Sequence, residues 1–304
     1  MHRPMILKTN VKLNFGLFVL RRRPDGFHDL ETLFVPWHGY GDTLEIIAGD
    51  DYSRTSASLA ARYGTDSGDG PGAPLRQAVS EDGRLMVTVA RREGVDWEPL
   101  SDLSARACRL LQQDFDLPPV KLFLEKTAPV GAGLGGGSAD AAFTLKGLNE
   151  CFGLGLDDAA LVSYAARLGS DCALFIHNRP MIGTGRGEVL EPYDLSLDGY
   201  DLQVIVPEGV GVSTAEAYRG ITPREAAGQA TGEPDGTAIR RILARPVEEW
   251  KGLLVNDFEA TVFPLHHELE AIRDSLYASG AVYASMSGSG SALFALYRKE
   301  GGRA

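Results

Sequence analysis

The feature of this sequence that most constrains its fold is the run GAGLGGG at residues 131–137, which is followed directly by Ser138. The run contains five glycines and joins a predicted strand at 120–126, VKLFLEK, to an Ala- and Leu-rich stretch with the character of a helix. Glycines leave consecutive backbone N–H groups open to an anion, and a helix N-terminus adds its positive end. The run therefore predicts a phosphate-binding loop rather than a flexible linker.

Three common phosphate-binding motifs do not account for this loop. A Walker A motif requires GxxxxGK[ST], and no lysine follows these glycines. Gly131, Gly133 and Gly136 satisfy GxGxxG, but a dinucleotide-binding fold then requires a strand ending in Asp or Glu about 20 residues later. A second predicted helix, 157–168, occupies that place. Protein kinases share GxGxxG, but the sequence contains neither HRD nor DFG.

Composition and element order limit the remaining classes. The 304 residues include 30 Lys and Arg against 41 Asp and Glu, a net charge of −11, so no general basic field attracts nucleic acid. The cysteines, Cys108, Cys151 and Cys172, are odd in number and lack CxxC spacing, which argues against disulfides and structural zinc. The longest uncharged stretch, 276–297, holds five serines and three glycines and is too polar for a membrane span. We expect a cytoplasmic protein, monomeric or homodimeric, without nucleic-acid or membrane partners.

The pattern P-x-G-x-G-L-G-G-G-S-x-x-A-A, from Pro129 to Ala142, resembles the ATP loop of the GHMP kinases, which include galactokinase, homoserine kinase and mevalonate kinase. That superfamily also has a late glycine loop, which SGSGS at 287–291 matches, although this run alone would equally suit an ordinary hairpin connection. Predicted strands and helices are mixed without regular βαβ alternation, which favours an α+β fold. The resemblance implies an ATP-binding lobe over 1–195 and a substrate-binding lobe over 196–304 around a central cleft.

Further motifs resemble the GHMP branch that phosphorylates 4-diphosphocytidyl-2-C-methyl-D-erythritol. They fall in that branch's order and cover most of residues 8–297: KLN at 12–14, RRPDGFHDLETLF at 22–34, LGSD at 168–171, GTGRGE at 183–188, STAEAY at 213–218 and NDFE at 256–259. The resemblance implies transfer of the ATP γ-phosphoryl group, with Mg²⁺, to the 2-hydroxyl of the cytidine diphosphate-linked substrate in the non-mevalonate isoprenoid pathway. Another GHMP kinase, acting on mevalonate or homoserine, and a catalytically silent nucleotide-binding relative remain alternatives.

The same resemblance assigns roles to single residues. Asp171 matches the catalytic base and Lys12 its cationic partner, which would keep the carboxylate ionised and stabilise charge on the attacking oxygen. Phe27 and His28 match an aromatic–histidine pair against cytosine, and Tyr218 matches the second aromatic wall. Asn14 matches a contact to the substrate polyol.

The expected ATP contacts lie in and beside the first glycine loop. Ser138 is also a candidate contact for Mg²⁺, and no cage made of protein ligands alone is expected. Asp102 stands where the branch commonly has Asn, which alters any amide contact to adenine. Residues 50–84 are expected to form a surface excursion without a catalytic role. The expected ATP contacts are Lys126, Pro129, Gly131, Gly133, Leu134, Gly135, Gly136, Gly137 and Ser138, and the late glycine loop comprises Gly288, Ser289 and Gly290.

Overall fold

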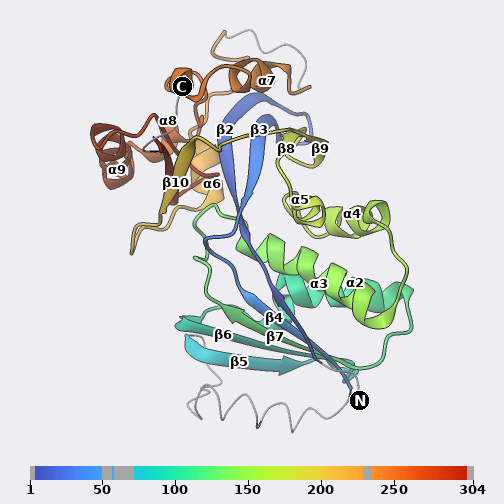
Figure 1. Ribbon diagram of the computed structural model, residues 1–304. Coiled ribbons are helices and arrows are strands. Elements are labelled where there is room, and N and C mark those ends of the chain that lie inside the picture. The colour runs from blue at the N-terminus through green and yellow to red at the C-terminus, as the bar shows by residue number, and fades with distance from the viewer. Residues whose placement is uncertain (1–3, 50–56, 58–71, 229–234, 300–304) are drawn as a thin grey trace. The chain divides into compact units, whose positions relative to one another are not determined.

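The chain folds into two compact units, each assembled from segments that are far apart in the sequence (Figure 1). The computed structural model describes residues 4–49, 57, 72–228 and 235–299. The first unit comprises Met1–Val11, Trp37–Pro129 and Gly136–Asn178, and the second comprises Lys12–Pro36, Val130–Gly135 and Arg179–Ala304. The boundary between the units therefore falls inside the glycine-rich run, between Gly135 and Gly136.

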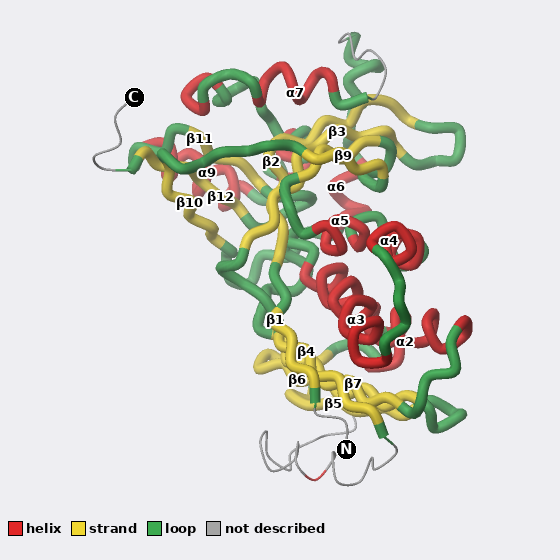
Figure 2. Tube along the Cα trace, turned by 45° about the vertical axis from the view of Figure 1, so that its right-hand side comes forward, coloured by secondary structure: helices red, strands yellow, loops and turns green. Residues whose placement is uncertain are grey.

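The first unit is a five-stranded sheet with helices on one face. Its strand order is β1-β4-β7-β6-β5, and all neighbours are antiparallel except the parallel pair β6 and β7. Figure 2 shows α2 and α3 along one face of this sheet. The helix α3 approaches β4 closely at Gly147, where an added Cβ would lie 2.5 Å from Ile46 Cδ1. The elements are β1 (Met5–Lys8), β4 (Thr43–Ala48), β5 (Ala73–Val79), β6 (Leu85–Val95), η1 (Pro99–Ser101), α2 (Leu103–Asp114), β7 (Val120–Lys126), α3 (Gly136–Phe152), α4 (Asp158–Ala166) and α5 (Cys172–His177).

The second unit contains two smaller sheets, ordered β2-β3-β8-β9 and β10-β12-β11. The ring of Phe15 in β2 packs against Phe294 in β12, with 4.6 Å between their centroids, and against the rings of Trp250 and Tyr283. The helix α9 packs against β11 and β12. The elements are β2 (Val11–Arg22), β3 (His28–Trp37), β8 (Met181–Thr184), β9 (Val189–Pro192), β10 (Tyr200–Ile205), α6 (Thr214–Arg219), α7 (Thr237–Leu243), η2 (Val247–Glu249), α8 (Glu259–Val262), α9 (His267–Ala278), β11 (Tyr283–Met286) and β12 (Leu293–Arg298).

The α+β class is confirmed, since strands and helices are mixed without βαβ repetition in both units. The units differ from the continuous lobes predicted over 1–195 and 196–304, because β2 contacts the C-terminal part of the chain. The Leu17 N–H donates to the Val255 carbonyl and Phe15 packs against Phe294, and β3 and β8 join β2 in one sheet. Which unit takes ATP and which takes the substrate stays a prediction. None of the helices in the described ranges is both long and apolar enough to cross a membrane.

The prediction for residues 50–84 was wrong in part. Ala73–Val79 forms β5, which pairs antiparallel with β6 as the edge of the five-stranded sheet. The strand is anchored because Leu75 is buried with Ala90 and Phe123 in a small apolar cluster. The rest of that prediction, over 50–56 and 58–71, lies outside the described residues.

Candidate active site

The two glycine loops lie against each other in the second unit. Gly133 has φ +75°, and a Cβ added there would lie 2.3 Å from the carbonyl oxygen of Ser287 and 3.0 Å from that of Gly290. The loops are also joined directly, because the Ala292 N–H donates to the Ala132 carbonyl at 3.1 Å. Only glycine combines this backbone conformation with this approach. The sequence predicted each loop separately, and the structure brings them together.

Strand β2 places Lys12 and Asn14 beside the loops. The Lys12 N–H donates to the carbonyl of Leu134 at 2.9 Å, and the Asn14 N–H donates to Ser287 Oγ at 3.2 Å. The two side chains are both buried, and Lys12 Nζ donates to Asn14 Oδ1 at 2.5 Å. Asn14 Nδ2 in turn donates to Thr32 Oγ1 at 3.0 Å, which fixes the orientation of the amide.

A buried ammonium therefore stands next to the late glycine loop. A Cβ added to Gly288 would lie 3.3 Å from Lys12 Nζ and 2.9 Å from the carbonyl oxygen of Gly133. Gly288 also has φ +57°, which glycine adopts most readily. The glycines leave the backbone accessible beside a fixed positive charge. This arrangement suits an anionic ligand such as a phosphate group.

In the first unit, Lys126 lies in a buried ionic cluster at the entry to the glycine-rich run. Its ammonium donates to the carboxylates of Asp42 and Asp140, whose side chains are fully buried. Burial lowers the pKa of Lys126, but the two carboxylates outweigh burial and raise it above its ordinary value. Burial raises the pKa of Asp140, and the Lys126 ammonium opposes that rise. Lys126 thus joins the start of α3 to the end of β7, and its contact with nucleotide stays a prediction.

Asp42 also holds the chain that leads into the loop. Its Oδ1 accepts hydrogen bonds from the backbone N–H groups of Thr127 at 2.6 Å and Ala128 at 2.8 Å. These bonds fix the two residues that directly precede Pro129. Neither Asp42 nor Asp140 was predicted from the sequence.

Asp171 and Ser138 lie near the start of α5 in the first unit. Asp171 is half-buried and occupies the N-cap position of α5, but its side chain does not cap the helix. Ser138 lies in the first turn of α3, and its hydroxyl acts to lower the pKa of Cys172, the residue after Asp171. Burial raises the pKa of Cys172 to about 11, so the thiol is protonated at neutral pH. Asp171 and Lys12 belong to different units, and their catalytic pairing stays a prediction.

The residues predicted to hold cytosine occupy two places in the second unit. The rings of His28 and Tyr218 stack, with 5.0 Å between centroids and 20° between planes, and Phe258 meets the Tyr218 ring edge-on at 4.7 Å. Phe27 is 54% exposed, and the guanidinium of Arg186 lies 5.0 Å from its ring centroid. The ring stacked on Tyr218 is therefore that of His28, and a cytosine held between Phe27 and Tyr218 stays a prediction.

Beside this turn lies a cavity of about 650 Å³ that the sequence analysis did not predict. Arg21 and Arg23 line it and are paired with the buried Asp29 at 2.6 and 2.9 Å, whereas Arg22, which also lines it, is exposed. The charge of Arg22 adds to burial in lowering the pKa of His28. Three successive arginines in the sequence indicate a cationic surface here, and Asp29 pairs with two of them. The remaining lining residues are Pro24, Thr184, Gly185 and Val189.

Asp102, the departure from the family pattern, caps α2. Its Oδ1 accepts from the N–H of Ser104 at 2.9 Å, and its Oδ2 accepts from Trp97 Nε1 at 3.0 Å. A carboxylate at an N-cap position is favourable because it satisfies a free amide and faces the positive end of the helix. The effect of Asp102 on adenine selectivity stays a prediction.

The chain is similar to known kinases over nearly its whole length. Residues 102–179 match the model for the GHMP kinases N terminal domain, and residues 238–304 match that for the GHMP kinases C terminal domain. The 4-diphosphocytidyl-2-C-methyl-D-erythritol kinase of Bacteroides fragilis is 43% identical over 296 residues, which are 97% of this chain and 93% of the relative. The kinase of the same name from Geobacter sulfurreducens is 34% identical over 97% of this chain and 91% of its own.

Solved structures agree with these relatives. A crystal structure of 4-(cytidine 5'-diphospho)-2C-methyl-D-erythritol kinase superposes with a TM-score of 0.68 at 29% identity, covering 96% of this chain and 90% of that one. The Methanococcus jannaschii mevalonate kinase shares the fold, with a TM-score of 0.60 at 12% identity over 98% of this chain and 92% of its own. By these matches, the chain belongs to the 4-diphosphocytidyl-2-C-methyl-D-erythritol kinase family of the GHMP kinases.

Proposed function

We propose that this protein transfers the γ-phosphoryl group of ATP to the 2-hydroxyl of 4-diphosphocytidyl-2-C-methyl-D-erythritol, a step in the supply of isoprenoid precursors. The observation that carries the proposal is the buried Lys12–Asn14 pair beside the junction of the two glycine loops. Full-length similarity to kinases named for this substrate supports it.

Phosphoryl transfer requires positioning and neutralisation of charge more than covalent help from the protein. The backbone N–H groups of the loops bind the phosphate groups, and the Lys12 ammonium stabilises negative charge near the attacking oxygen. Asp171 accepts the proton of the substrate hydroxyl. Asn14 orients the polyol while its amide stays fixed by Thr32.

Mg²⁺ bound to the triphosphate lowers its charge and favours transfer. Within the described residues, no group of three or more His, Cys, Asp or Glu side chains is arranged to hold a metal ion. The protein fits an ion that takes most of its ligands from phosphate and water. The Ser138 hydroxyl, in the first turn of α3, is the protein oxygen that we assign to it.

The cytidine diphosphate group is recognised at the turn that carries Phe27 and His28. The stacked His28 and Tyr218 rings offer an aromatic surface and an imidazole nitrogen to cytosine, and the exposed Arg22 offers charge to the diphosphate. We place the protein in the cytoplasm, which its three free cysteines, Cys108, Cys151 and Cys172, support.

The test is ADP release from ATP and Mg²⁺ in the presence of 4-diphosphocytidyl-2-C-methyl-D-erythritol, mevalonate or homoserine. We expect turnover with the cytidylyl substrate alone. Turnover with mevalonate or homoserine would keep the fold and the loop chemistry but overturn the assigned substrate. ATP binding without turnover on any of the three would identify a silent relative.

A further inference from the structure

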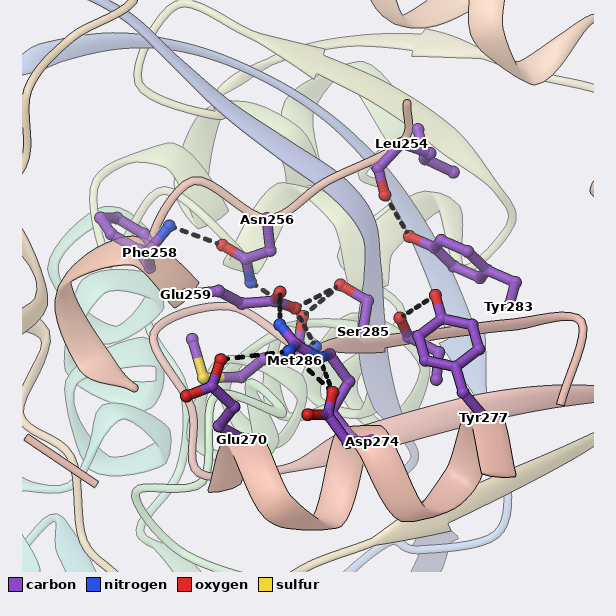
Figure 3. Close-up of polar contacts among 12 residues, drawn as sticks. Leu254, Asn256, Phe258, Glu259, Glu270, Asp274, Tyr277, Tyr283, Ser285 and Met286 are labelled. Atoms are coloured by element: carbon purple, nitrogen blue, oxygen red, sulfur yellow. Dashed lines mark hydrogen bonds and ion pairs between the residues drawn. The ribbon is translucent and has the colours of Figure 1, made fainter. Parts of the chain in front are cut away.

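The segment Asn256–Glu259, which carries the NDFE motif, lies between strand β2 and strand β11 of the second unit. Its backbone runs beside β2, because the Leu17 N–H donates to the Val255 carbonyl at 2.9 Å and the Asp257 N–H donates to the Leu17 carbonyl at 2.8 Å. Strand β11 is the edge of its sheet, so one side of its backbone has no strand partner among the described residues. Figure 3 shows the side chains of Asn256 and Glu259 directed at this edge.

At Met286, the side chains of Asn256 and Glu259 make the backbone hydrogen bonds that a neighbouring strand would otherwise make. Glu259 Oε1 accepts from the Met286 N–H at 2.8 Å, and Asn256 Nδ2 donates to the Met286 carbonyl at 2.8 Å (Figure 3). The next residue, Ser287, points its N–H the other way, to the carbonyl of Ala292 at 2.8 Å. Both backbone groups of Met286, the last residue before the late glycine loop, are thus fixed by side chains.

Asn256 reaches one residue further, into the loop itself. Its Nδ2 also donates to the carbonyl of Gly288 at 2.8 Å, and its Oδ1 accepts from the N–H of Phe258 at 3.0 Å. The side chain is buried, both amide hydrogens donate, and the amide oxygen accepts one hydrogen bond. The carbonyl that it holds belongs to the glycine that lies beside the ammonium of Lys12.

Glu259 makes two further polar contacts, one at each carboxylate oxygen. Ser285 Oγ donates to its Oε1 at 2.9 Å, and the guanidinium of Arg273 on α9 lies 3.4 Å from its Oε2. Burial raises the pKa of Glu259, whereas the Met286 N–H, Ser285 and Arg273 oppose that rise. The carboxylate is a suitable anchor for the loop because Arg273, on a separate helix, fixes its second oxygen.

We propose that Asn256 and Glu259 are positioning residues for phosphoryl transfer, which set the backbone of the late glycine loop, and with it Gly288, against the ammonium of Lys12. Neither side chain is assigned a contact with substrate. The catalytic role of these two residues rests on the proposed function. The hydrogen bonds by which they hold the loop are present in the folded chain whatever its activity.

The experiment compares Asn256→Ala with Tyr277→Phe. Tyr277 Oη donates to the carbonyl of Ala284 at 2.9 Å, so it also bonds the edge of β11 but does not touch the loop. We expect Asn256→Ala to speed amide hydrogen exchange in residues 286–291 and to lower kcat about 100-fold, because displacements near 1 Å have effects of that order. Its KM for ATP should change less than about threefold, as for an interaction made in the transition state. Tyr277→Phe should leave exchange at 286–291 and kcat unchanged.

A second pair of variants, both at Glu259, separates the effect on loop position from the effect on stability. Glu259→Gln keeps an oxygen for the Met286 N–H but loses the charge facing Arg273, whereas Glu259→Ala loses both. We expect both variants to unfold at lower temperature, and only Glu259→Ala to show faster loop exchange and lower kcat when assayed well below its unfolding temperature.

Unchanged amide hydrogen exchange in residues 286–291 of both Asn256→Ala and Glu259→Ala would overturn the proposal, whatever the substrate. Faster exchange with unchanged kcat would overturn its catalytic part. If the wild-type protein turned over none of the three alcohols, the proposed function would fail, while the exchange data would still decide whether these residues hold the loop.

Discussion

Replacing Gly133 with alanine tests whether the two glycine loops must touch. An alanine there meets two obstacles: a backbone at φ +75° and carbonyl oxygens at 2.3 and 3.0 Å from the new methyl carbon. The backbone conformation costs a non-glycine residue about 1–2 kcal/mol. Crowding against backbone atoms, which cannot rotate away as a side chain can, adds about 1–3 kcal/mol. We therefore expect Gly133→Ala to lower the free energy of unfolding by about 2–5 kcal/mol.

Gly131 provides the matched control. It lies in the same loop with φ +74°, but a Cβ added there has no atom within 4 Å among the described residues. Gly131→Ala should therefore show only the conformational part, about 1–2 kcal/mol. Urea unfolding of the wild type and both variants, followed by circular dichroism, measures the difference. The kcat of Gly133→Ala should also fall, because the loop beside Lys12 is pushed away. Equal destabilisation by the two variants would refute the contact between the loops.

Three further predictions concern titratable and reactive side chains. Asp171→Ala should lower kcat by about 10²–10⁴-fold, the usual contribution of a general base, while nucleotide binding followed by fluorescence stays near that of the wild type; a near-normal kcat would remove the base assignment. Burial and Arg22 lower the pKa of His28, so the unfolded chain binds the proton more readily, and the free energy of unfolding should fall as the pH drops below about 6.5. His28→Gln should flatten that dependence in thermal melts at pH 5 to 8, and an unaltered slope would contradict it. Burial raises the pKa of Cys108 to about 12, so a thiol reagent at pH 8 should label the half-buried Cys151 well before Cys108, as peptide mass spectrometry would show.

Local patterns predicted much of the fold. The helix predicted over 157–168 corresponds to α4, and the run at 120–126 predicted β7, because periodicity and turn chemistry act within a few residues. Strand β5 was missed because a segment rich in Ser, Gly and Asp surrounds it, and its only apolar anchor, Leu75, is buried by residues of two other strands. Pairing with a distant strand can outweigh local preference in this way.

The parts of the site with an unusual local composition could be predicted from the sequence. Contacts between common residue types that lie far apart in the sequence could not. The glycine loops stood out by composition. The bond from Lys126 to Asp42 joins residues 84 positions apart, and that from Asn256 to Met286 joins residues 30 apart. No spacing rule connects such pairs, since the fold alone brings them together. The discontinuous units follow for the same reason, because the bond from the Leu17 N–H in β2 to the Val255 carbonyl is a long-range contact.

The central claim is that a phosphoryl group passes from ATP to a hydroxyl of an intact cytidylyl substrate. The most direct measurement is the ³¹P NMR spectrum of a reaction containing the protein, ATP, Mg²⁺ and 4-diphosphocytidyl-2-C-methyl-D-erythritol. If the proposed transfer occurs, one new phosphomonoester signal forms in step with ADP, while the diphosphate signals of the substrate persist. Release of inorganic phosphate without a phosphomonoester, or loss of the substrate diphosphate, would contradict it.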